Sequence, residues 1–341
     1  MLRQFSEASG FFYELHHYTT LAGLTGIIKS NSIWATNFRY LNDTTEVRHL
    51  GAKLAEAVAP IFDNLIRSRR KKNVDLDLAI ARANGPKALA REWANNAVGD
   101  LYRLMFDEGP DRFVQLDPYI ISFCSHDKDS EYERENGLLS QWRAYGTANG
   151  AAIVFDTYKI VEWLTAEISH YRYGNAHLVQ VVYNDGKQTF ESSFGYLIES
   201  FSAFAKEIVD REFPIGTRDI KWRELGYGIS LERFVEYFAY SICAFKHRGF
   251  AEEREVRFVV YPLTGGASNS ETDKLPIKPV LTRGSNATRY IEYGRDGLPL
   301  LSTVRRIIVG PSPKQRELAT EIRLLVGTGI DIILSETPLL R

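Results

Sequence analysis

The chain has 341 residues, of which 44% are hydrophobic and 25% charged, so it is long enough to bury a substantial core and is typical of a soluble protein. Its formal net charge of -1 excludes a global field that would attract nucleic acid or an anionic membrane, and such binding would need a local patch. We see no leader peptide and no apolar run of spanning length, which predicts a cytoplasmic protein without a membrane partner. Cys124 and Cys243 lie in apolar stretches without metal-ligand spacing, so we expect buried thiols and no metal site.

The N-terminal stretch predicts a strand, a helix and a second strand in quick succession. Residues 15–20 favour a strand, and apolar residues then recur at helical spacing over 21–28. Thr20 is placed to cap this helix and Asn31 to end it, before a second strand at 33–36.

His17 and Tyr18 stand near the end of the first expected strand, just before the helix begins. Backbone N–H groups at a helix start are free to meet an anion such as a pyrophosphate. The alternative is that His17 is an ordinary structural histidine.

Residues from about 44 to 107 show helical periodicity, which predicts a helical insertion at about 46–110 within a single domain of residues 1–341. A basic run, Arg67 to Lys72, lies inside this region. Such a run is most often a solvated helix end, and a nucleic-acid patch is the alternative, although no aromatic residue is interleaved with it.

The rest of the chain predicts a mixed α+β domain built on short strands that bracket a cleft. Strands are expected at 118–125, 151–156 and 179–183, with helices at 138–146, 194–209 and 231–247. Residues 300–341 predict a C-terminal strand, helix and strand.

The stretch Phe250 to Tyr261 combines a strand pattern with an unusual arrangement of charges. Alternation in this stretch would place Glu253, Glu255 and Arg257 on one face. Two neighbouring carboxylates repel unless a cation or a substrate lies between them, which is typical of sites where pKa values are driven apart. The alternative is an edge strand whose charges prevent pairing with other sheets.

Several of these stretches together resemble the bacterial family catalogued as domain of unknown function 2971, over about residues 13–262. The residues that carry the resemblance are Leu15-His16-His17-Tyr18-Thr19 with Gly26-Ile27-Ile28, Leu41-Asn42-Asp43 with Glu46, Ser122-Phe123-Cys124-Ser125 with Gln141-Trp142-Arg143-Ala144-Tyr145 and Ala152-Ile153-Val154-Phe155-Asp156, and Phe245-Lys246 with Phe250, Glu253, Glu255 and Arg257. The family name supplies no activity.

A more distant resemblance does imply an activity. A His-aromatic pair on a first strand, a helix with Gly-Ile and a late Glu-x-Glu strand are similar to the NAD-binding core of ADP-ribosyltransferases. That resemblance implies split, short-stranded mixed sheets around a cleft, with NAD as the substrate and no metal. It also implies that His17 contacts the NAD ribose, that Glu255 is catalytic, and that Glu253 lies near the acceptor.

Several residues qualify for each of the remaining NAD contacts. Tyr18, Tyr40 and Tyr145 all qualify for stacking on nicotinamide, and Arg39, Arg143 or Arg257 for holding the pyrophosphate. Arg257 is better placed as the ion-pair partner of Glu255. We expect one pocket, lined by His17, Tyr18, Asn42, Glu46, Trp142, Tyr145, Glu253, Glu255 and Arg257, although Asn42 and Asp43 are also typical of a plain turn.

Three functions from different classes follow as hypotheses. The first is NAD-dependent ADP-ribosyl transfer or NAD hydrolysis, as in a toxin or defence effector, with an unnamed protein or nucleic acid as acceptor. The second is a module that senses a nucleotide without turning it over. The third is a protein that docks a partner or nucleic acid through the basic helical insertion; a homo-oligomer remains open in each case.

Overall fold

The computed structural model describes residues 12–41, 45–70, 73–106, 117–126, 131–146, 149–183, 187–213, 229–263, 274–294 and 298–338. The chain divides into two compact units, and each consists of segments that are distant in the sequence. The first unit comprises Met1–Asn42, Asp117–Val181 and Gly249–Arg341, and the second comprises Asp43–Leu116 and Val182–Arg248. The expected insertion at 46–110 falls in the second unit together with a later segment that the sequence did not assign to it. That all 341 residues act as a single domain stays a prediction.

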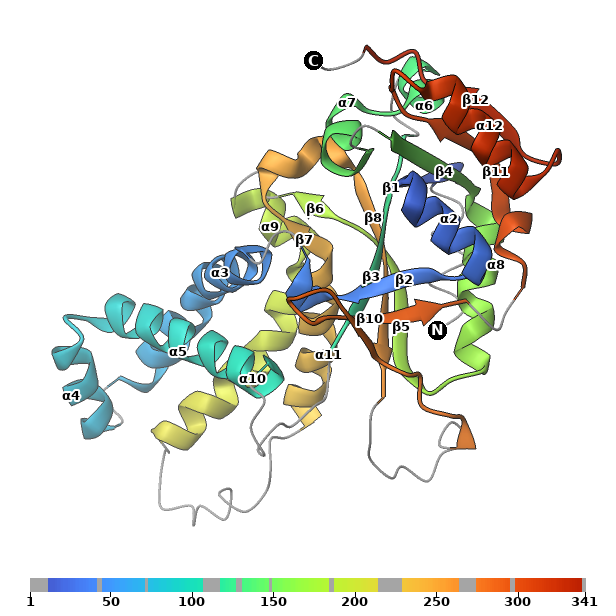
Figure 1. Cartoon of the computed structure of the whole chain (residues 1–341). Helices are drawn as coiled ribbons and strands as arrows, with labels where there is room; N and C mark the ends of the chain where they lie inside the picture. Colours follow the sequence, from blue (N-terminus) through green and yellow to red (C-terminus); the bar gives the residue numbers. More distant parts are fainter. Residues whose placement is uncertain are drawn as a thin grey trace. The chain divides into compact units, whose positions relative to one another are not determined.

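A mixed sheet forms the centre of the first unit (Figure 1). Its described strands are β1 (Glu14–Thr20), β2 (Ile33–Asn37), β3 (Tyr119–Cys124), β4 (Gly150–Asp156), β5 (Tyr173–Gln180), β8 (Glu255–Pro262), β9 (Leu281–Arg283), β10 (Thr288–Tyr293), β11 (Val304–Val309) and β12 (Asp331–Leu334). β11 and β12 pair in parallel, and the other described pairs of this sheet are antiparallel. The predicted combination of helices with a mixed sheet is therefore confirmed.

The sheet branches at β3. One edge of β3 pairs with β8 along its whole length, from Tyr119 to Cys124. The other edge is shared, because β2 pairs at the start of β3 and β1 pairs at its end, through His16 and Cys124. From this point β1 continues to β4, β11 and β12, while β2 continues to β10 and β9.

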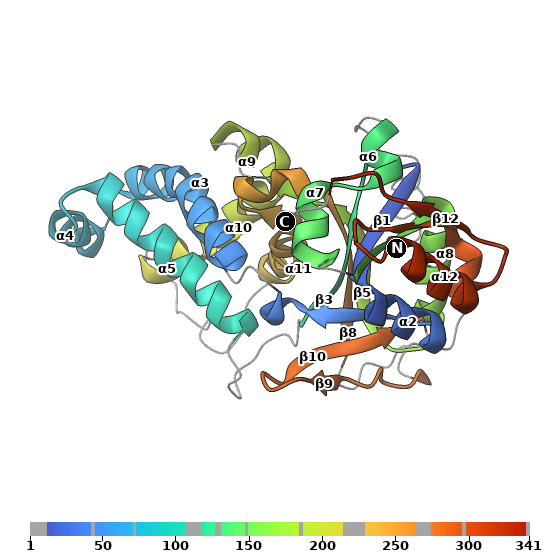
Figure 2. The same ribbon diagram turned by 45° about the horizontal axis from the view of Figure 1, so that its top comes forward.

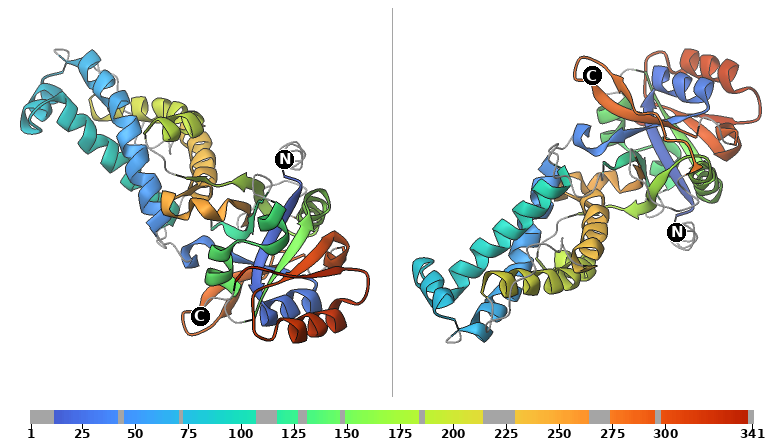
Figure 3. Two further views of the ribbon diagram at one scale, coloured as in Figure 1. Left: turned by 90° about the horizontal axis from the view of Figure 1, so that it is seen from above. Right: turned by 90° about the horizontal axis from the view of Figure 1, so that it is seen from below.

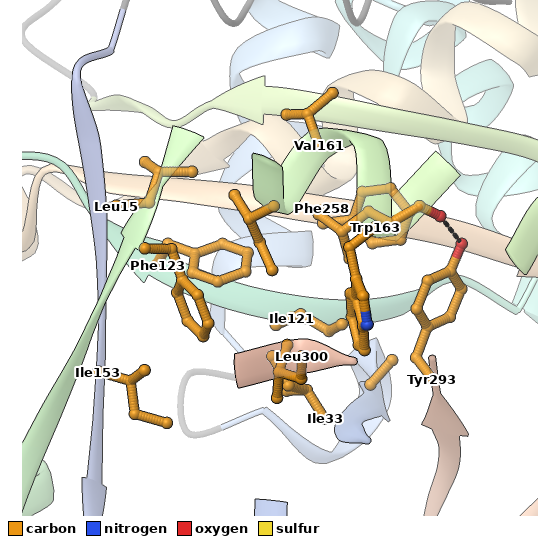
Figure 4. Packing of buried hydrophobic residues seen from close by; sticks show 14 of the residues in the cluster. Leu15, Ile33, Ile121, Phe123, Ile153, Val161, Trp163, Phe258, Tyr293 and Leu300 are labelled. Carbon is orange, nitrogen blue, oxygen red and sulfur yellow. Dashed lines mark hydrogen bonds between the residues drawn. The ribbon is translucent and has the colours of Figure 1, made fainter. Parts of the chain in front are cut away.

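One face of this sheet carries a continuous apolar core. Alternate residues of the strands point into it, among them Leu15, Phe123, Ile153 and Phe258. Three helices supply the opposite side of this core: α2 (Leu21–Ser30), α8 (Thr157–Ala166) and α12 (Gln315–Val326). Figure 4 shows Trp163 of α8 beside Leu300, and the Tyr293 hydroxyl, which donates to the Leu164 carbonyl at 2.5 Å.

The local signals at the N-terminus are confirmed. The Thr20 hydroxyl accepts a hydrogen bond from the Gly23 amide at 3.1 Å and caps α2. Asn31 ends the helix in the left-handed conformation with a φ of 54°, which asparagine tolerates better than most residues. The Asn31 side chain also accepts from the Leu300 amide at 2.7 Å, so the helix end is tied to a distant segment.

The second unit is largely helical. Its described helices are α3 (Thr45–Arg69), α4 (Val74–Arg82), α5 (Pro86–Phe106), α9 (Lys187–Ser193), α10 (Gly195–Glu212) and α11 (Ile229–Ala244). α3 and α5, blue and cyan in Figure 3, lie side by side. Phe62 of α3 is fully buried and packs edge to face on Phe201 of α10, which in turn contacts Phe234 of α11. This unit therefore has an aromatic core of its own.

The structure corrects several sequence expectations. β8 lies between β3 and β5 with all of its residues buried, so the alternative of a charged edge strand is wrong. Glu253 belongs to a short 3-10 helix, Arg248–Glu253, and not to the strand. α11 ends at Ala244, because Phe245 and Lys246 form β7, which pairs with β6 (Val182–Tyr183). The strands β9 and β10 were not predicted, since each is short and irregular in its alternation.

Within the described part of the chain, every helix is too short or too polar to span a bilayer.

Candidate functional site

The centre of the candidate site is an ion pair on β8. Arg257 Nε donates to Glu255 Oε1 at 2.8 Å, and Arg257 Nη2 donates to Glu255 Oε2 at 2.9 Å. Both side chains are buried, with exposed fractions of 2% and 6%. Residues two apart on a strand share a face, which explains why these two side chains meet. The predicted ion pair between Arg257 and Glu255 is confirmed.

This pair lies on the sheet face opposite the apolar core. Val256 and Phe258 of β8 point into that core, so Glu255 and Arg257 point away from it. Across the sheet, Glu255 is in register with Cys124 of β3, and Cys124 is in register with His16 of β1. Two strand spacings separate His16 from Glu255, a distance of about 10 Å between backbones.

The same face carries a second ion pair, between the buried Glu14 and the part-buried Arg306. Arg306 of β11 donates to both oxygens of Glu14, from Nη1 at 2.7 Å and from Nη2 at 2.6 Å. His16 Nε2 donates to Glu14 Oε1 at 3.0 Å, since a carboxylate only accepts. His16 is fully buried, and among the described residues its Nδ1 has no hydrogen-bond partner.

Tyr18, the next residue on this face of β1, is hydrogen-bonded to two segments that follow β3 in the sequence. The Leu138 amide donates to the Tyr18 hydroxyl at 3.0 Å, and the hydroxyl lies 3.0 Å from His126 Nε2. Because the hydroxyl accepts from Leu138, its own proton is available for Nε2 of a neutral His126. The His126 ring also packs edge on against His16, with the centroids 4.3 Å apart. We call Glu14, His16, Tyr18, His126 and Arg306 the buried polar cluster.

The pKa values of Glu14, His16 and His126 are all lowered in the folded protein. Burial alone would raise the pKa of Glu14, but the hydrogen bonds from His16 and Arg306 lower it from 4.5 to about 2. Burial lowers the pKa of His16, and burial together with the neighbouring His16 lowers the pKa of His126 to about 2. Near neutral pH the face therefore holds an ionised Glu14 beside neutral histidines. Such a concentration of perturbed groups is typical of functional sites.

His17 does not share this face. Because successive side chains of a strand point to opposite faces, His17 points to the same face as Leu15, which lies in the apolar core. The His17 ring contacts Phe123 of the same core. His17 Nδ1 lies 2.9 Å from the Ser122 carbonyl, and burial lowers the pKa of His17. The structure therefore places His17 and Glu255 on opposite faces of the sheet.

Several other predicted site residues do lie on the face of Glu255. Trp142 packs edge to face on Tyr18, with the ring centroids 4.8 Å apart, and its Nε1 donates to the Asn136 carbonyl at 2.9 Å. Tyr145 packs against the hydrophobic residues of this face, which include Tyr18, Trp142 and Val154. The segment that carries Trp142 and Tyr145 therefore covers β1 and β4 on this side.

The remaining candidates are placed elsewhere or lie outside the described residues. Arg39 forms an ion pair with Asp117 at 3.5 Å, and Arg143 is exposed. Asn42 and Asp43 lie outside the described residues, as does the side chain of Glu46.

The basic run at the end of α3 is only partly a solvated helix end. Arg67 and Arg70 are exposed, but Arg69 is buried and its Nη1 donates to the carbonyls of Val209 and Phe213 at 3.0 and 2.9 Å. Arg69 therefore satisfies the C-terminus of α10, which weakens the hypothesis of a nucleic-acid patch here. Lys71 and Lys72 lie outside the described residues.

Sequence reasoning missed Glu14, His16, His126 and Arg306. One local signal was available, because Glu14, His16 and Tyr18 alternate with the apolar Leu15 and so share a face. No comparable signal pointed to Arg306, which pairs with Glu14 across 292 residues of sequence. The described residues hold no group of three or more His, Cys, Asp or Glu side chains placed to bind a metal ion.

Residues 141–258 match the model of a family described as a protein of unknown function, DUF2971. The predicted resemblance to this family is therefore confirmed over that range, which includes Trp142, Tyr145, Glu253, Glu255 and Arg257. No curated protein and no solved structure gives a significant match.

Proposed function

We propose that this chain cleaves the bond between nicotinamide and ribose in NAD, as an ADP-ribosyltransferase or an NAD glycohydrolase. The proposal rests on the buried Glu255 carboxylate, both of whose oxygens accept hydrogen bonds from Arg257. The buried polar cluster, which includes Tyr18, lies on the same face of the sheet. Burying a carboxylate and its counter-charge costs desolvation free energy. In an active site, such a preorganised charge can stabilise a cation that forms during the reaction.

The chemistry explains the need for a carboxylate. When the bond from ribose C1′ to the nicotinamide nitrogen breaks, its electron pair leaves with nicotinamide, and positive charge develops on C1′ and the ring oxygen. Glu255 would stabilise this cation where it forms, and Arg257 would keep Glu255 ionised. Water or an acceptor group then attacks C1′ and loses its proton. No metal is required for this step.

The arrangement of strands also supports an ADP-ribosyltransferase-like fold for the first unit. The sheet branches at β3, so that β1 and β8 meet it on opposite edges and the two halves diverge from there. On the face of Glu255 the histidine of β1 is His16, which is fully buried, so the ribose contact expected of His17 stays a prediction. Tyr18, Trp142 and Tyr145 supply aromatic rings on the same face.

The test is nicotinamide release from NAD, followed by chromatography with and without cell extract as a source of acceptor. Glu255→Gln keeps the shape of the side chain but removes its charge, and should lower the rate by about 10²–10³-fold. Glu253→Gln should spare hydrolysis and reduce only transfer to an acceptor, because Glu253 lies off the strand, beyond Glu255.

A control is needed because Glu255→Gln removes the carboxylate to which the buried Arg257 donates from Nε and Nη2, and losing one partner of a buried ion pair by itself destabilises a fold. The double variant Glu255→Gln/Arg257→Gln removes both charges and should fold better while remaining inactive. If wild type and Glu255→Gln release nicotinamide at equal rates, or if wild type releases none, the proposal is wrong. Thermal stabilisation by NAD without release would instead favour a nucleotide-sensing module.

A further inference from the structure

The outer strands of the first unit carry an aromatic and cationic stack. β2, β10 and β9 are neighbours in that order in the sheet. Figure 2 shows β10 and β9 side by side. Trp34 of β2 and Tyr290 of β10 lie on one face of these strands, with ring centroids 4.5 Å apart and planes inclined by 38°. The Arg283 guanidinium of β9 lies 4.8 Å from the Trp34 centroid. Trp34 is 42% exposed, although tryptophan is usually well buried.

Arg283 and Tyr290 do not cover opposite faces of the Trp34 indole. The Arg283 guanidinium is 6.0 Å from the Tyr290 centroid. If Arg283 and Tyr290 covered opposite faces of Trp34, they would be separated by nearly the sum of their distances to it, 4.8 and 4.5 Å, which far exceeds 6.0 Å. The two side chains therefore support the indole from neighbouring directions and do not sandwich it.

Basic side chains outnumber acidic ones in the segment that carries β9 and β10. Residues 274–293 contain four basic residues and one acidic residue, Glu292. Lys278 is neutralised by Glu167 at 2.8 Å, whereas Lys274 and Arg283 are exposed. Arg289 is in register with Thr282 and points to the face opposite Arg283 and Tyr290. The turn between β9 and β10 adds exposed hydrogen-bonding side chains, Ser285 and Asn286. Glu292, in register with Trp34, is half-buried.

We propose that the surface formed by the exposed Trp34 and Arg283, with the buried Tyr290 packed against the indole, binds an unpaired base and the adjacent phosphate of single-stranded nucleic acid. An exposed aromatic ring stacks on any base, and a neighbouring guanidinium binds the phosphate with two hydrogen bonds. The base-pair stack of a duplex would hide the bases from Trp34, so single strands are the ligand that this chemistry selects. The proposal does not depend on the NAD chemistry.

The experiment is fluorescence anisotropy with short fluorescein-labelled oligothymidine, oligouridine and a duplex of the same length, at low and at physiological salt. The two single strands distinguish DNA from RNA as the preferred ligand. Trp34→Ala should weaken binding about tenfold or more, and Trp34→Phe should retain most of the affinity because it keeps a ring. Arg283→Ala should weaken binding and reduce the salt dependence by about one unit of slope.

Two matched controls lie on the same unit, away from the stack. Tyr158→Ala removes an aromatic ring that is 70% exposed on α8, and Arg316→Ala removes an exposed cation on α12. Both controls should bind like wild type. The proposal is overturned if wild type binds neither single strand at low salt, if Trp34→Ala binds like the controls, or if the duplex binds as tightly as the single strands.

Discussion

Replacing Glu14 by glutamine should remove a large, pH-dependent part of the stability of this protein. The Glu14 carboxylate is 3% exposed and accepts hydrogen bonds from both terminal nitrogens of Arg306 and from His16. Glutamine has nearly the same volume, so the change removes a charge and little packing. Arg306, 18% exposed, would keep its charge and lose its partner.

The magnitude follows from the pKa of Glu14, which is lowered from 4.5 to about 2 in the folded protein. Each pKa unit corresponds to about 1.4 kcal/mol, so the ionised carboxylate contributes about 3 kcal/mol to the free energy of unfolding. Because the folded pKa lies below the unfolded one, this contribution is fully present above pH 4.5 and is lost as the pH falls towards 2.

The assay is urea unfolding followed by circular dichroism at several pH values between neutral and about pH 3, for wild type, Glu14→Gln and a control. Glu14→Gln should be less stable by about 3 kcal/mol near neutral pH, and the difference should shrink below pH 4.5. Glu321, exposed on α12, provides the control, and Glu321→Gln should change stability by less than about 0.5 kcal/mol. A loss below about 1 kcal/mol, as for a surface ion pair, or a loss independent of pH would refute the reasoning.

Two further predictions concern buried polar contacts. Lys278 and Glu167 form an ion pair with exposed fractions of 4% and 2%, so Lys278→Met should lower stability by about 3–5 kcal/mol in thermal or urea unfolding, and a loss no larger than that of Glu321→Gln would contradict it. Tyr18→Phe removes the hydroxyl between the Leu138 amide and His126, and should cost about 1–3 kcal/mol; unchanged unfolding would show that this bridge contributes nothing.

The sequence alone determined those features that depend on near neighbours. The strand, helix and strand at the N-terminus were predicted because the Thr20 cap and the Asn31 stop act within one turn of α2. The ion pair of Glu255 and Arg257 was predicted for the same reason, because residues two apart on a strand lie on the same face. The stripe of apolar residues on α3 likewise follows from helical periodicity alone.

Tertiary structure decided which strands are neighbours, and this determined which of the candidate residues share a face of the sheet. The charges of β8 suited an edge strand as well as an interior one, and only its pairing with both β3 and β5 shows that they are buried. Sequence reasoning selected His17 and missed the adjacent His16, and the packing of Leu15 into the core determined that His16, not His17, shares the face of Glu255. Glu14 and Arg306 are 292 residues apart in the sequence, and they meet because β4 pairs with both β1 and β11. Contacts between residues so far apart leave no periodic signal in the sequence.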